Sequence, residues 1–142
     1  MTDNGQQIQD VVTLIVPSHP KFLYVMRSAL YPLVIGAGFP KKDARKIVLA
    51  VDEACSNIIK YAYEGDHSRT IALNVSVGQD KLVVVLKDSG KKPDIASISP
   101  RKLDDIRPGG LGTFFMAAAF DTIEYDTSGP AGTVLTLIKE KR

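Results

Sequence analysis

The spacing of apolar residues in the N-terminal half of the chain predicts two amphipathic helices. Between about residues 20 and 35, apolar side chains return every three or four positions, with Ser18 placed to cap the helix and Pro32 placed to kink or shorten it. A second helix is expected from about 41 to 63. Its core-facing positions are Ala44, Ile47, Val48, Val51, Ala54, Cys55, Ile58 and Ala62. Each helix therefore has one face that must pack against another layer.

Short β-branched stretches predict five strands and, with the helices, the fold class. The first strand is expected at 11–16, and "TIALNVSV" and "KLVVVLKD" form a hairpin around "GQD". "GTFFMAAAF" predicts a short apolar helix, and two last strands follow with a Ser-Gly-Pro turn between them. Short turns between neighbouring strands favour antiparallel pairing. We expect an α/β (α+β) two-layer sandwich, with a mainly antiparallel or mixed sheet and helices on one face.

From 89 to 109 the periodic pattern gives way to Pro, Ser, Asp, Lys and Arg. An irregular connection of about 20 residues is uncommon in a compact domain and usually forms a lid or binding loop. Residues 1–9 are polar and are expected to be a flexible N-terminus. We therefore expect one domain over 1–142 with a lid at 89–109.

Composition narrows the classes of function. The net charge is +2, which is too small to indicate binding to nucleic acid or to an anionic membrane. No apolar run approaches the ~20 residues of a membrane-spanning helix, and the first ten residues do not resemble a signal peptide. The single cysteine excludes an internal disulfide. These features predict an intracellular protein without a membrane segment.

Glu53 and Asn57 lie four residues apart on the second predicted helix, so their side chains point the same way. Together with Lys60 and Glu64 they occupy a polar stripe about 60° wide. A solvated helix face explains such a stripe without any function. The alternative is a metal-phosphate site, because an amide oxygen suits Mg²⁺ and a nearby carboxylate can accept a proton from a nucleophile.

Two further short segments carry candidate chemistry near strand ends. In "LKDSGKKPD", Asp88 ends a strand and Gly90 follows; the segment is either a plain turn or a site where Asp88 accepts a hydrogen bond from a ligand amine and Gly90 admits a flat ring. In "PAGTVLTL", Thr133 opens the last strand, either for its strand propensity or to direct a hydroxyl into a pocket.

The stretch "RPGGLGTFF" places glycines before a predicted helix. Glycines at a helix start expose unpaired backbone N–H groups, which form an anion site suited to phosphate, although a flexible loop is an equal alternative. The residues concerned are Arg107, Gly110, Leu111 and Gly112. The stretch lacks the Gly-Lys-Ser/Thr of a P-loop and the third glycine of a dinucleotide fingerprint.

Two other residue types yield no site. His19 and His67 lie far apart in the sequence without ligand spacing, so we expect no metal site built from protein ligands alone. Cys55 falls on the core-facing arc and is expected to be a buried small hydrophobe rather than a nucleophile.

The order of the four segments resembles the GHKL ATPase superfamily. That order is Glu-x-x-x-Asn on a helix, Asp-x-Gly after a strand, Gly-Gly-Leu-Gly before a helix, and Gly-Thr on a late strand. The short chain is similar to the bacterial anti-sigma factor serine/threonine kinases, and "VDEACSNIIKYAY" and "GGLGTFFM" carry most of this likeness. The resemblance covers about 12–139 and implies a Bergerat-type ATP-binding fold.

The resemblance also implies roles for individual residues, with ATP and Mg²⁺ as cofactors. It implies that Asn57 coordinates the Mg²⁺ that bridges the phosphates and that Glu53 is the catalytic base for a serine or threonine hydroxyl. At the adenine, Asp88 binds the amino group, Gly90 allows the ring to approach and Thr133 assists. At the phosphates, the implied residues are Arg107, Gly110, Leu111 and Gly112.

The implied partners are a sigma factor and an anti-sigma factor antagonist protein, in the bacterial cytoplasm, with a possible homodimer. Two alternatives remain from the sequence. One is a regulatory module that binds a partner protein and keeps ATP, if at all, as a structural ligand. The weaker one is a detached histidine-kinase catalytic domain, which the absence of a phospho-accepting histidine helix disfavours.

Overall fold

The computed structural model describes residues 10–93 and 111–142. Expectations that concern 1–9 and 94–110, including most of the predicted lid, lie outside the described residues. The elements are β1 (Asp10–Pro17), a 3₁₀ turn η1 (Pro20–Phe22), α1 (Leu23–Gly36), α2 (Lys41–Asn57), a π-helical turn η2 (Ile58–Ala62), β2 (Thr70–Val77), β3 (Lys81–Asp88), α3 (Leu111–Ala119), β4 (Thr122–Asp126) and β5 (Thr133–Glu140).

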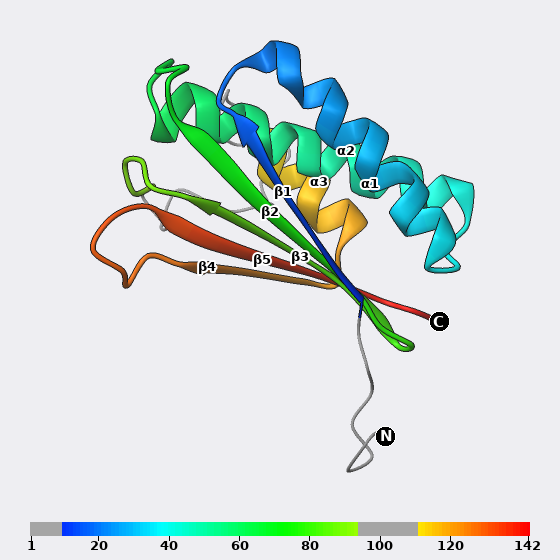
Figure 1. Cartoon of the computed structure of the whole chain (residues 1–142). Coiled ribbons are helices and arrows are strands. Elements are labelled where there is room, and N and C mark those ends of the chain that lie inside the picture. Colours follow the sequence, from blue (N-terminus) through cyan, green and yellow to red (C-terminus); the bar gives the residue numbers. More distant parts are fainter. Residues whose placement is uncertain (1–9, 94–110) are drawn as a thin grey trace.

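The five strands form one sheet in the order β1-β2-β3-β5-β4, and every neighbouring pair is antiparallel. The three α-helices cover one face of this sheet, with α2 packed against both α1 and α3 (Figure 1). The sequence-based expectation of a two-layer α/β sandwich with a mainly antiparallel sheet is confirmed. No helix in the described ranges is long and apolar enough to cross a bilayer.

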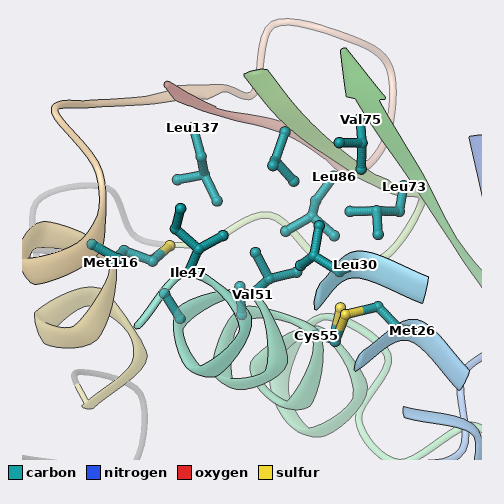
Figure 2. Close-up of a cluster of buried hydrophobic side chains, with 14 of the residues drawn as sticks. Met26, Leu30, Ile47, Val51, Cys55, Leu73, Val75, Leu86, Met116 and Leu137 are labelled. Carbon is teal, nitrogen blue, oxygen red and sulfur yellow. The ribbon is translucent and has the colours of Figure 1, made fainter. Parts of the chain in front are cut away.

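The core lies between α2 and the sheet. Along β3, Leu82, Val84 and Leu86 are buried and their neighbours less so, as the period of two requires for a strand with one covered face. Figure 2 shows Ile47 and Val51 of α2 directed toward the side chains of the sheet. Because one face of α2 is packed against the core, the polar residues on its other face have fixed positions relative to the sheet.

The junction before α1 differs from the expectation. The 3₁₀ turn η1 leads directly into α1. His19 caps η1 by accepting a hydrogen bond at Nδ1 from the Lys21 N–H (3.1 Å). Ser18, expected to be the cap, is fully buried and donates instead to the carbonyl of Asp66 (2.7 Å). The prediction for Ser18 was therefore wrong: a buried hydroxyl requires a partner, and the loop before β2 provides one. Pro32 lies inside α1, which continues to Gly36.

The last turn of the long helix also differs, and this difference matters for the site. After Asn57 the helix widens into η2, where the Tyr63 N–H donates to the Ile58 carbonyl five residues earlier (2.9 Å). This turn contains one more residue than an α-helical turn, so the core-facing positions move on by one. Ile59 and Tyr63 are buried, whereas Ile58 and Ala62, the expected core positions, are only partly buried.

The π-turn predicts an order of mutational effects that regular α-helical spacing does not. Ile59→Ala should lower the free energy of unfolding by about 2–4 kcal/mol, as expected for a fully buried isoleucine. Ile58→Ala is the matched control, one residue earlier and half-buried, and should cost clearly less. Urea denaturation of the two variants measures the difference. Equal losses, or a larger loss for Ile58→Ala, would contradict this register.

Candidate functional site

The end of β3 brings two of the predicted residues together. Asp88 pairs with Thr133 across the β3–β5 ladder. Asp88 lies two positions after the buried Leu86 on β3, and Thr133 lies two positions before the buried Leu135 on β5. Because side chains alternate along a strand, both therefore face the helical layer. The carboxylate of Asp88 is half-buried and accepts a hydrogen bond at Oδ1 from the Gly90 N–H (2.9 Å). A carboxylate and a hydroxyl thus lie side by side at the edge of the core.

The pKa of Asp88 is raised, and desolvation by burial is the largest cause. Hydrogen bonds from the backbone of Gly90 and Thr133 and the positive charge of Arg69 oppose this shift. The carboxylate is therefore partly shielded from water, and a hydrogen-bond donor on a ligand would stabilise its ionised form.

Gly90 lies where no side chain fits. A Cβ at this position would be 2.3 Å from the Ala62 carbonyl oxygen, and the next residue, Lys91, donates its N–H to that same oxygen (2.7 Å). The segment after β3 is therefore in direct contact with the end of η2. Gly132, before Thr133, combines a positive φ of 74° with a Cβ position 1.9 Å from the Asp88 carbonyl oxygen, so it too must be glycine.

The hydroxyl of Thr133 is the observation that best indicates a ligand. Thr133 is 7% exposed, and among the described residues its Oγ1 is a buried side-chain oxygen with no hydrogen-bond partner. A buried unpaired hydroxyl costs free energy, and native structures avoid it unless a ligand or water supplies the partner. The groups at this end of the site, a carboxylate, a hydroxyl without a partner and a glycine, fit a flat ligand with exocyclic polar groups.

Glu53 and Asn57 lie on α2, four residues apart and both half-buried. Within the described ranges, no hydrogen bond or ion pair involves either side chain, whereas neighbouring Asp52 is engaged by Arg27 of α1 (2.7 Å). Asn57 is the last residue of α2, directly before η2. Ala62 lies five positions further along the chain, which is roughly 7 Å along a helix axis. The contact between Ala62 and Lys91 therefore joins the Asn57 segment to the Asp88 segment.

The predicted phosphate-binding residues are described only in part. α3 begins at Leu111 with Gly112 in its first turn, and α3 packs against α2, so its N-terminal backbone lies on the same helical layer as Asn57. Arg107 and Gly110 lie outside the described residues. Lys92, which follows Asp-x-Gly, donates from Nζ to the carbonyl of Gly129 in the β4–β5 turn (2.6 Å). That ammonium group is thus occupied by backbone.

The structure also shows the surroundings of the cysteine and the two histidines, for which the sequence indicated no site. Cys55 is fully buried, as expected for a core residue, and burial raises the pKa of its thiol to about 12. His19 and His67, expected to be unrelated, have ring centroids 4.1 Å apart. In the described part of the chain, no three His, Cys, Asp or Glu side chains form a group that could hold a metal ion.

One contact at this site has no sequence signal. The Ala62 carbonyl is a backbone group at the C-terminal end of η2, where the last helical carbonyls lack an intrahelical partner, so it can accept from Lys91. A helical residue before a strand end carries no mark of such a contact in one sequence.

Comparison with known proteins identifies the family of the chain. The profile of the histidine kinase-like ATPase domain matches residues 16–139, and the chain belongs to that family. It is 28% identical to Serine-protein kinase RsbW of Listeria innocua, over 95% of this chain and 92% of that protein. It is 24% identical to Serine-protein kinase RsbW of Bacillus subtilis, over 89% and 84% of the two chains. The matched region contains every segment of the candidate site.

The unpaired hydroxyl predicts a substitution that stabilises the protein. Thr133→Val should raise the free energy of unfolding of the ligand-free protein by about 1 kcal/mol, because it removes a buried hydroxyl that has no partner. Thr136→Val is the matched control: the same exchange on the same strand, but on the face away from the helices, at a residue that is only partly buried. Chemical denaturation compares the two. A loss of stability in Thr133→Val beyond that of the control would show that the hydroxyl has a structural partner.

Proposed function

We propose that this protein binds ATP with Mg²⁺ and is a protein serine/threonine kinase that phosphorylates an anti-sigma factor antagonist and sequesters a sigma factor. The observation that carries the proposal is the free Thr133 hydroxyl beside Asp88, joined through Ala62 to the helix of Asn57 and Glu53. Family membership supports ATP as the nucleotide. The printed name of the relatives, a serine-protein kinase, supports the reaction class.

At the adenine end, the described contacts support the proposed roles. The Asp88 carboxylate accepts a hydrogen bond from the exocyclic amino group, and the Thr133 hydroxyl gains the partner that it lacks. Gly90 contributes no Cβ, and its N–H holds the carboxylate in place. Because guanine has a carbonyl where adenine has an amino group, an acceptor such as Asp88 favours adenine.

At the phosphate end, Asn57 is the proposed protein ligand of Mg²⁺. The bound ion would neutralise charge on the phosphate oxygens. An amide oxygen on a helix fits this task, because Mg²⁺ takes hard oxygen ligands and retains several waters. The backbone N–H groups at the start of α3, at Leu111 and Gly112, are proposed to contact phosphate together with Gly110, and Arg107 is proposed to face the terminal phosphate.

In the proposed transfer step, a serine or threonine oxygen of the antagonist protein attacks the terminal phosphorus of ATP. The bond from that phosphorus to the β–γ bridging oxygen breaks, ADP leaves, and Glu53 accepts the hydroxyl proton. Glu53 is suited to this role because it lies one helical turn from Asn57 and is not engaged by other described groups. Positioning and charge neutralisation supply most of the acceleration in such reactions.

The finer parts of the proposal are the two partners, the bacterial cytoplasm as the location, and a possible homodimer. They rest on the resemblance of the four motifs to anti-sigma factor kinases. The competing function is a regulatory module that binds its partner without transferring phosphate. The two differ in one residue's task, since only a kinase requires the carboxylate of Glu53.

Glu53→Ala should separate binding from transfer. The variant should bind ATP·Mg²⁺ within about twofold of wild type but lose about 10²–10⁴-fold in phosphotransfer, the range for loss of a general base. The measurement is transfer of the terminal phosphate to a purified antagonist protein. Asp52→Asn, the adjacent acid that pairs with Arg27, is the control and should keep full transfer. If wild-type protein binds ATP but transfers no phosphate to any cognate antagonist, the binding-module function replaces the kinase.

Asn57→Ala should remove the dependence of nucleotide binding on the metal. For wild type, the dissociation constant of ATP should be lower with Mg²⁺ than with a chelator present. For Asn57→Ala the two values should converge, because the proposed metal ligand is lost. Isothermal titration calorimetry measures both. Asn74→Ala, on β2 where the amide accepts from Thr13, should behave like wild type. A metal dependence unchanged in Asn57→Ala would exclude Asn57 as the ligand.

A further inference from the structure

Tyr63 connects three segments of the chain at the edge of the candidate site. It follows η2 directly, and its side chain is 4% exposed. Its hydroxyl donates to the carbonyl of Thr70, the first residue of β2 (2.6 Å), and accepts from the N–H of Ser89, the first residue after β3 (3.0 Å). One buried phenol thus joins the end of the long helix to two strand ends.

Arg69 holds the other side of the same residue. Its guanidinium lies 4.8 Å from the centre of the Tyr63 ring, within cation–π range. From Nη2 it donates to the backbone carbonyl of Ser89 (3.0 Å) and to the Ser89 hydroxyl (2.7 Å). The N–H and C=O of Ser89 are therefore both taken, one by Tyr63 and the other by Arg69. Hydrogen bonds to both the N–H and the C=O of one residue restrict the orientation of its backbone, because each bond has a preferred direction.

Ser89 is the residue between Asp88 and Gly90, the two residues to which the proposed function gives the adenine. Any rotation of the peptides that flank Ser89 would move the Asp88 carboxylate relative to the Thr133 hydroxyl across the ladder. It would also break the contact of Gly90 and Lys91 with the Ala62 carbonyl. The Tyr63–Arg69 pair therefore acts on the spacing of the groups that would contact the base.

We propose that Tyr63 and Arg69 are positioning residues that set the affinity and selectivity for adenine by fixing the Ser89 backbone. This inference rests on the proposed function and deepens it. Neither residue is assigned a contact with the nucleotide; each acts through Ser89 on Asp88 and Gly90. Preorganised contacts bind more tightly because the ordering has been completed before the ligand arrives.

Tyr63→Phe tests the proposal most directly, since it keeps the ring under Arg69 and removes only the hydroxyl. The affinities for ATP·Mg²⁺ and ADP should both fall about three- to tenfold, the range for losing one positioned hydrogen bond. The ratio of ATP affinity to GTP affinity should narrow by a similar factor. The ratio of ATP affinities with and without Mg²⁺ should stay as in wild type. A merely structural role would lower the unfolding temperature and leave the ratio of ATP affinity to GTP affinity unchanged.

Arg69→Gln is the second variant, because it alters a partly exposed residue and should fold even if Tyr63→Phe does not. It should weaken ATP and ADP to a similar extent. In the double variant the losses should fall short of the product of the single ones, because both side chains hold one residue. Tyr61→Phe, 43% exposed and two residues before Tyr63, is the matched control and should bind like wild type.

The outcomes separate this inference from the proposed function. In one outcome, wild type binds ATP·Mg²⁺ tightly and both Tyr63→Phe and Arg69→Gln have affinities for ATP and ADP within twofold of wild type. This result would overturn the positioning role and leave the proposed function intact. Equal losses for adenine and guanine nucleotides would overturn the role in selectivity. Wild type that binds no adenine nucleotide would overturn the proposed function, and this inference with it.

Discussion

The contact between the segment after β3 and the end of η2 is the constraint on which the site depends. Lys91 donates its N–H to the Ala62 carbonyl, and Gly90 makes this possible because a Cβ at that position would lie 2.3 Å from the same oxygen. One end of the contact continues into Asp88, the other into Asn57. A single backbone hydrogen bond thus sets how far the proposed adenine end lies from the proposed metal end. The Ala62 carbonyl is available for this contact because it lies at the C-terminal end of η2, where helical carbonyls lack an intrahelical partner.

The site contains groups that are unfavourable in the folded protein taken alone. Burial raises the pKa of Asp88, so its ionised form is held at a cost, and the Thr133 hydroxyl has no partner among the described residues. The core between α2 and the sheet is apolar and closely packed, and it offsets these costs. Local terms that oppose stability at a binding site are expected where the missing partner is a ligand.

The layers of the fold could be predicted from the sequence because periodicity alone determines them. Alternation along β3 matched the structure, and the core-facing positions expected up to Cys55 are buried except for Val48, which is partly buried. The register of η2 could not be predicted, since an i→i+5 hydrogen bond leaves no mark in the apolar pattern, and Ile58 was expected in the core where Ile59 lies. Ser18 was expected to be a cap because a cap is a local interaction, whereas its actual partner, Asp66, is 48 residues away.

In the candidate site, too, local relations between residues could be predicted from the sequence and long-range contacts could not. Residues on one element, such as Glu53 with Asn57, or Asp88 with Gly90, could be paired from their spacing. The roles of Tyr63 and Arg69 depend on contacts with Ser89 across 26 and 20 residues, and no pattern in one sequence indicates such contacts. Partner choice depends on surface side chains in the same way.

The central claim is that a nucleotide with Mg²⁺ lies between Asp88 and Asn57. A crystal structure of the protein with Mg²⁺ and a non-hydrolysable ATP analogue tests this claim most directly. The account predicts the adenine amino group within hydrogen-bond distance of the Asp88 carboxylate, a polar partner for the Thr133 hydroxyl, and the Asn57 amide oxygen on the ion. An analogue bound elsewhere on the protein, with Thr133 still unpartnered and Asn57 without metal, would contradict it.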